Sequence, residues 1–134
     1  MTVLVTGAAG LLGAALTAAL AAQGKTVIAM VHKTSEIRNN TGDVIPAAAC
    51  DPSSAPSGIQ VVRGDVRNPG LGLDPATREW LDRHVSAVVH CAALVRFEAA
   101  WDELEAINVT GTRHVAQLCP CARFIHVSTA YVCG

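Results

Sequence analysis

Three glycines spaced three residues apart, Gly7, Gly10 and Gly13, carry the clearest chemical signal in this chain. A short apolar, β-branched run precedes them (residues 3–5), and leucines recur every fourth residue after them, so the pattern predicts a buried strand, a tight turn and a helix. Glycine at such a turn lets a phosphate approach bare backbone, where the N–H groups and positive dipole of a helix N-terminus meet it. Gly7 would supply the turn geometry, Gly10 would clear the phosphate path, and Gly13 would let helix and strand pack closely.

This opening segment has two other interpretations. It could be a strand-to-helix turn that binds no ligand. It could also be a signal peptide, because it is apolar and rich in alanine, but no positive residue precedes the apolar run and regular glycines interrupt it, which argues against a signal peptide.

His32 and Lys33 follow a second predicted buried strand, residues 26–31. Turns that bind NAD place an acidic residue near this point to hold the ribose hydroxyls, whereas turns that bind NADP remove the acid and offer a cation to the 2′-phosphate. Val31 stands where the acid is expected, so the sequence favours NADP(H) over NAD. The alternative is that these charges are simply solvated on a loop.

Two further strand ends offer candidate contacts for a nucleotide. Residues 59–62 predict a third strand that leads to Asp65, whose carboxylate could meet an adenine amino group or could be an ordinary turn residue. Residues 85–89 predict a fourth strand that ends in His90-Cys91-Ala92-Ala93. Small residues at the carboxyl end of a strand beside the glycine turn leave a crevice open, which is where open α/β sheets bind ligands.

Two more helices and a fifth strand complete the expected elements. A helix is predicted over residues 75–84, and the longest helix over residues 98–119, followed by a strand over residues 124–127. Residues 35–58 lack periodicity and predict an irregular loop with room for a helical turn. One face of the longest helix is expected to be buried, and it carries Trp101, Leu104, Asn108, Gly111, Val115 and Leu118. A buried Asn108 would be either a structural tie to backbone or part of an active-site network.

The composition predicts one α/β domain. The chain has 134 residues, 51% of them apolar, and a net charge of −1, which fits a doubly wound parallel sheet of about five strands in the order 3-2-1-4-5. No basic stripe suggests nucleic acid, and no apolar run is long enough to cross a membrane. Five scattered cysteines favour reduced thiols and a cytoplasmic location, and their spacing with histidines indicates no metal site.

The chain resembles the extended short-chain dehydrogenase/reductase superfamily along nearly its whole length. The motifs that carry the resemblance, in the order and spacing of that superfamily, are VTGAAGLLG, GDV, HCAA, INVTGT and HVSTAYVCG. Within it, GLGL and HCAALVRF look most like the thioester reductase, fatty acyl-CoA reductase and carboxylic acid reductase group. The resemblance implies NADPH as hydride donor and an acyl thioester as substrate.

The resemblance also implies site residues. Thr129 falls on the catalytic hydroxyl, with Ser128 beside it, and Asn108 falls on the supporting asparagine. Cofactor contacts are expected from Gly7, Gly10, Leu11, Leu12, Gly13, His32, Lys33, Asp65, Val66, Cys91, Ala92 and Ala93. The superfamily's Tyr-x-x-x-Lys pair has no counterpart. Tyr131, the only tyrosine, follows Thr129 too closely, and no lysine stands four residues after it. Residues 1–134 are therefore expected to be the N-terminal, Rossmann-type part of a reductase, without its substrate domain and inactive alone.

Two other functions share these motifs. One is a sugar-nucleotide epimerase/dehydratase or hydroxysteroid dehydrogenase of the same superfamily. The other is a non-catalytic module that senses dinucleotide. In either case a five-stranded open sheet would expose an apolar edge, so the isolated chain is expected to form homodimers or to aggregate.

Overall fold

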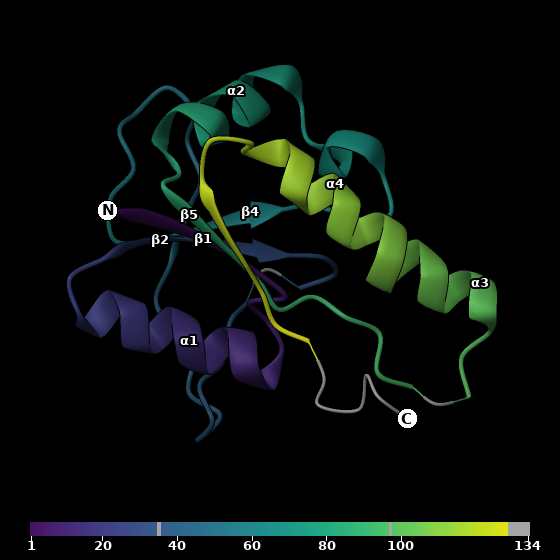
Figure 1. Cartoon of the computed structure of the whole chain (residues 1–134). Coiled ribbons are helices and arrows are strands. Elements are labelled where there is room, and N and C mark those ends of the chain that lie inside the picture. The colour runs from purple at the N-terminus through teal and green to yellow at the C-terminus, as the bar shows by residue number, and fades with distance from the viewer. Residues whose placement is uncertain (35, 97, 129–134) are drawn as a thin grey trace.

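The computed structural model describes residues 1–34, 36–96 and 98–128 (Figure 1). Within them a parallel sheet of six strands has the order β3-β4-β2-β1-β5-β6. Its strands are β1 (Thr2–Thr6), β2 (Thr26–Val31), β3 (Ala48–Ala49), β4 (Ile59–Arg63), β5 (Ala87–His90) and β6 (Arg123–His126). Apart from the short edge strand β3, this is the predicted doubly wound order, and the prediction of an α/β Rossmann-type sheet is confirmed.

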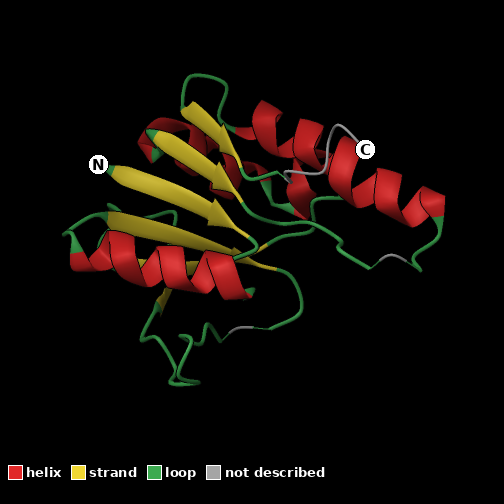
Figure 2. Ribbon diagram, turned by 60° about the horizontal axis from the view of Figure 1, so that its bottom comes forward, coloured by secondary structure: helices red, strands yellow, loops and turns green. Residues whose placement is uncertain are grey.

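Helices cover both faces of the sheet (Figure 2). Helix α1 (Leu11–Ala22) packs on one face, and α2 (Pro75–His84) and α4 (Gly111–Leu118) pack on the other. Side chains alternate along β1, so that Val3 and Val5 join the core under α1 while Leu4 joins the core under α2 and α4. Burial on both faces explains why the central strands are continuous apolar runs in the sequence.

Residues 35–58, which were predicted to be irregular, contribute β3 to the sheet edge. Ala48 and Ala49 pair with Gln60 and Val61 of β4. Two alanines give no local strand signal, so this strand depends on its pairing with β4. No helical turn is present in the described part of this region.

The prediction for the longest helix is wrong in two respects. The helix begins at Trp101 rather than at residue 98, as α3 (Trp101–Leu104), and passes through a π-helical segment (Glu105–Thr110) before α4. Trp101, expected to be buried, is 75% exposed, and Leu104 and Asn108 are only half-buried, while Gly111, Val115 and Leu118 are buried as predicted. The wider π-helical turn rotates α3 away from the face that α4 buries, and Figure 1 shows α3 extending beyond the sheet.

No helix among the described residues is both long enough and apolar enough to span a lipid bilayer.

Candidate functional site

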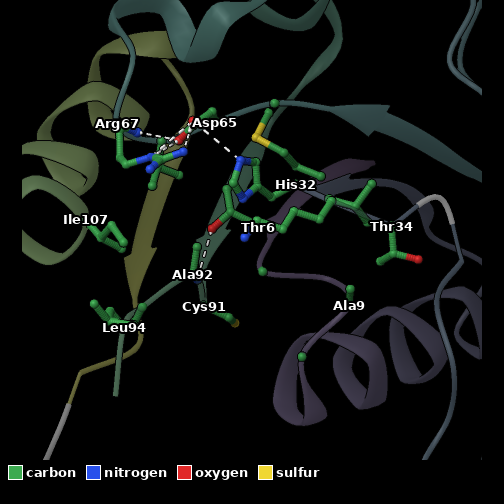
Figure 3. Close-up of a pocket in the computed structure, with 18 of the residues that line it drawn as sticks. Thr6, Ala9, His32, Thr34, Asp65, Arg67, Cys91, Ala92, Leu94 and Ile107 are labelled. Carbon is green, nitrogen blue, oxygen red and sulfur yellow. Dashed lines mark hydrogen bonds and ion pairs between the residues drawn. The ribbon is translucent and has the colours of Figure 1, made fainter. Parts of the chain in front are cut away.

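A cavity of about 870 Å³ lies at the carboxyl ends of β1, β2, β4 and β5 (Figure 3). This is the edge where open α/β sheets bind ligands, next to the point where the strand order reverses. Most of the predicted cofactor residues line the cavity: Gly7, Gly10, His32, Lys33, Asp65, Val66, Cys91, Ala92 and Ala93. Leu11, Leu12 and Gly13 do not line it.

The three glycines of the turn serve different purposes in the structure. Gly7 has a positive φ of 66°, and a Cβ there would lie 2.7 Å from the backbone nitrogen of Ala92. A Cβ on Gly13 would overlap the carbonyl oxygen of Gly7. Gly10 is extended, and a Cβ there would meet only the oxygen of Gly7, at 3.2 Å. The fold itself therefore needs Gly7 and Gly13, whereas Gly10 keeps a wall of the cavity bare.

Helix α1 begins directly after Gly10 and has no side-chain cap. Leu11 and Leu12 are 81% and 54% exposed, and their backbone N–H groups belong to the first turn of this helix. The first turn of an α-helix leaves such groups without intrahelical partners, which makes it suited to an anion.

A chain of hydrogen bonds centred on His90 adjoins the cavity, and no role was predicted for it from the sequence. The Nδ1 atom of His90 lies 2.6 Å from the hydroxyl of Thr6, and Nε2 lies 3.0 Å from the hydroxyl of Thr112. The Thr112 hydroxyl donates to the carbonyl of Asn108, so it must accept from Nε2–H of His90. Thr6 then donates to Nδ1 and accepts from the backbone N–H of Ala92.

The protonation state of His90 agrees with this arrangement. Burial, with a smaller contribution from the charge of His126, lowers the pKa of His90 to about 4. The imidazole is therefore neutral at pH 7, with one donor and one acceptor nitrogen, as Thr6 and Thr112 require.

Asn108 does not line the cavity but holds one of its walls. Its side-chain oxygen accepts from the backbone N–H of Leu94 at 2.8 Å, and its amide nitrogen donates to the carbonyl of Leu94 at 2.9 Å. Leu94 lines the cavity. Of the two roles considered for Asn108, the geometry matches the tie to backbone; a role in catalysis stays a prediction.

Asp65 forms an ion-pair cluster at the far side of the cavity from the glycine turn (Figure 3). Its Oδ2 atom lies 2.6 Å from Nη2 of Arg67 and 3.4 Å from Nε2 of His32. Hydrogen bonds from Arg67 are the main cause that lowers the pKa of Asp65 to about 2. Asp65 is thus ionised at pH 7 and already paired, and its predicted contact with adenine stays a prediction.

Of the two predicted catalytic hydroxyls, only that of Ser128 belongs to the described residues, and Ser128 does not line the cavity. Ser128 is exposed just after β6. Thr129, with Tyr131, lies outside the described residues.

Cysteines and histidines form no metal centre in the part of the chain that the structure describes. The four described cysteines are free thiols, and burial raises the pKa of Cys91, the one that lines the cavity.

Comparison with known proteins finds a matching family and several relatives. The model of an NAD-binding family described as "Male sterility protein" matches residues 5–134. A fatty acyl-CoA reductase of Drosophila melanogaster is 38% identical over 77 residues, which cover 54% of this chain and 15% of that protein.

Two solved structures share the fold over most of the chain. The terminal R domain from the myxalamid PKS-NRPS biosynthetic pathway is 28% identical, with a TM-score of 0.72 over 96% of this chain and 34% of that one. The enzyme WbmG of Bordetella bronchiseptica, solved in complex with NAD, is 29% identical, with a TM-score of 0.69 over 97% of this chain and 38% of that one. The chain thus spans little more than a third of these structures, and less of the reductase.

Proposed function

Because this chain belongs to the NAD-binding family described as male sterility protein, we propose that it is the NADP(H)-binding portion of an NADPH-dependent reductase that acts on acyl thioesters. The observation that carries the proposal is the cavity at the carboxyl ends of the strands, with the bare backbone of Gly10 and the N-terminus of α1 on one side and His32 and Lys33 on another.

The cavity fits a dinucleotide. Its volume of about 870 Å³ lies within the usual range for cofactor sites. Gly10 lines the cavity, and a Cβ there would meet the protein only at the backbone oxygen of Gly7, which is the arrangement expected where a phosphate passes. In addition, Val31 stands where an NAD-binding turn would place an acid, and the cations His32 and Lys33 follow it, which supports NADP(H).

The acyl thioester is proposed from the relatives. The Drosophila melanogaster protein is named a fatty acyl-CoA reductase, and the myxalamid domain is the terminal R domain of a PKS-NRPS pathway. In the thioester-reducing group that the motifs resemble, the carbonyl carbon of the thioester accepts the hydride.

Each residue would then have a defined task. When bound, NADPH would supply the hydride. The N–H groups at the start of α1 would bind its pyrophosphate, and His32 and Lys33 would face its 2′-phosphate. Thr129, by the resemblance, would donate a hydrogen bond to the substrate carbonyl oxygen and stabilise the negative charge that develops there.

The test is a titration with NADPH and NADH followed by nicotinamide fluorescence. We expect tighter binding of NADPH, loss of binding of both nucleotides in Gly10→Val, and a reversed preference in His32→Asp. Ala15→Val, which adds a comparable side chain on the exposed face of α1, is the matched control and should bind as wild type does. Absence of binding of either nucleotide to a folded wild-type chain would contradict the proposal.

A further inference from the structure

Arg67, a cation that lines the cavity, is fixed by several hydrogen bonds to Asp65. Its Nε atom donates to both carboxylate oxygens of Asp65, at 2.9 and 3.1 Å, and its Nη2 atom donates to Oδ2 at 2.6 Å. The backbone N–H of Arg67 also donates to Oδ1 of Asp65, at 3.0 Å. A planar guanidinium bound along one edge in this way has a fixed orientation.

The other edge of this guanidinium remains available. Among the hydrogen bonds of the described residues, none uses Nη1 of Arg67. The side chain is 47% exposed and lines the cavity. An arginine that is oriented by one carboxylate and presents its remaining N–H groups to a cavity can bind a second, external oxyanion without first being ordered.

Arg67 also lies beside the residue already expected to select the cofactor. His32 and Arg67 approach the same oxygen of Asp65, so β2 and β4 bring two nitrogen donors together at one end of the cavity (Figure 3). Lys33 lines the same cavity. The hydrogen bond to the Asp65 carboxylate, with smaller contributions from the charges of Asp65 and Glu103, raises the pKa of Arg67.

We propose that Arg67 is a second specificity-determining residue of this site, whose outer guanidinium edge binds the 2′-phosphate of NADP(H) beside His32 while Asp65 holds it in position. This inference rests on the proposed function. It differs from the sequence-based assignment, in which the cations come only from the loop after β2, because Arg67 follows β4 and is distant from that loop in the chain. It predicts that a change of Arg67 weakens the binding of the 2′-phosphate and leaves the binding of the adenosine unchanged.

The test uses two fragments that differ only by the 2′-phosphate. Binding of 2′,5′-ADP and of 5′-AMP is measured by calorimetry for wild type, Arg67→Gln and Arg67→Lys. A hydrogen bond to a charged group corresponds to about 10- to 100-fold in affinity. We therefore expect Arg67→Gln to weaken 2′,5′-ADP by about that factor and 5′-AMP by less than about twofold. Arg67→Lys, which keeps the charge without the planar fork, should fall between Arg67→Gln and wild type.

The matched control is Arg63→Gln, which removes the same charge from the end of β4 outside the cavity lining and should leave the ratio of the two affinities unchanged. Circular dichroism confirms that each variant is folded. Equal loss of affinity for both fragments in Arg67→Gln would overturn the inference by placing Arg67 against the adenosine. No loss of affinity for either fragment would overturn it as well. If the folded wild-type chain binds neither fragment, the proposed function fails and this inference with it. A wild-type preference for 2′,5′-ADP that is unchanged in Arg67→Gln overturns the inference alone.

Discussion

His90 contributes to stability as a neutral side chain, and this gives the fold a pH dependence. The pKa of His90 is about 4 in the fold against an ordinary value of 6.5, because burial disfavours the charged imidazole. Between these two values the unfolded chain binds a proton that the folded chain does not. The free energy of unfolding therefore falls as pH falls from about 6.5 to about 4 and loses nothing further from His90 below that range.

We expect His90→Gln to flatten the pH dependence of stability in that window. Glutamine cannot titrate there, although it can still reach a hydroxyl on either side. Urea denaturation followed by circular dichroism at several pH values between 4 and 7 measures the slope. His84→Gln, at a half-buried histidine on α2, is the control and should keep the wild-type slope. A wild-type slope in His90→Gln would show that another group causes the pH dependence.

Asp65 adds a separate, more acidic dependence. Its pKa is lowered from 3.8 to about 2 in the fold, mainly by hydrogen bonds from Arg67. The stability that this ionised carboxylate provides is complete above pH 3.8 and is lost as pH falls toward 2, below the range in which His90 acts.

At the level of elements, the junction of β1 and α1 depends on Gly13. Glycine is a poor helix former, and replacing it with alanine in a helix usually stabilises by about 1 kcal/mol. Here the added Cβ would overlap the carbonyl oxygen of Gly7. We expect Gly13→Ala to destabilise the fold by about 1–3 kcal/mol in urea denaturation, because the helix must move away from the turn.

The control for Gly13→Ala is Ala15→Gly, at an exposed position of the same helix, which should cost only the helix propensity of about 1 kcal/mol. A stabilised Gly13→Ala protein would mean that the turn yields more easily than its close contacts indicate.

The link between Asn108 and Leu94 joins the π-helical segment to the loop after β5. Both hydrogen bonds of the Asn108 side chain go to the backbone of Leu94. We expect Asn108→Ala to make the Leu94 amide exchange its hydrogen about fivefold faster or more, since one hydrogen bond contributes about 1 kcal/mol. Hydrogen exchange followed by NMR measures this. Asn40→Ala, at an exposed asparagine, should leave the rate unchanged, and an unchanged rate in Asn108→Ala would contradict the tie.

At the level of the whole molecule, β6 is the last strand at one side of the sheet that the described residues form. Among the described residues β6 pairs only with β5, and its side chains Phe124 and Ile125 are 36% and 45% exposed. An exposed edge strand with apolar side chains is a template for pairing with another chain. The expectation from the sequence that this chain dimerises or aggregates stays a prediction, and β6 is the strand through which we expect the chains to pair.

We expect the 134-residue chain to associate at high concentration in light scattering, and Ile125→Lys to reduce that association, because a lysine on an edge strand opposes pairing. Val44→Lys is the control, since Val44 is similarly exposed at 48% but lies away from β6. A monodisperse wild-type monomer at high concentration would contradict this prediction.

Local patterns in the sequence were sufficient for the order of the five main strands, the glycine turn and helix α2. Each depends on neighbouring residues: apolar runs make buried strands, leucines at a helical spacing make α1, and Asp74 caps α2 by accepting from the backbone N–H of Thr77. Once these elements are known, right-handed crossovers leave few ways to arrange a parallel sheet. The family motifs then predicted where a nucleotide would lie.

Only the tertiary structure decided which side chains meet. His90 and Thr6 are 84 residues apart, and His90 and Thr112 are 22 apart, so their hydrogen bonds arise from the register of β1 against β5 and the packing of α4. The same holds for His32, Asp65 and Arg67, which converge because β2 and β4 are neighbours. The π-helical segment and the exposure of Trp101 likewise depend on how the last helix meets the sheet. Spacing along a chain determines the face of an element, but contacts across the fold depend on how whole elements pack.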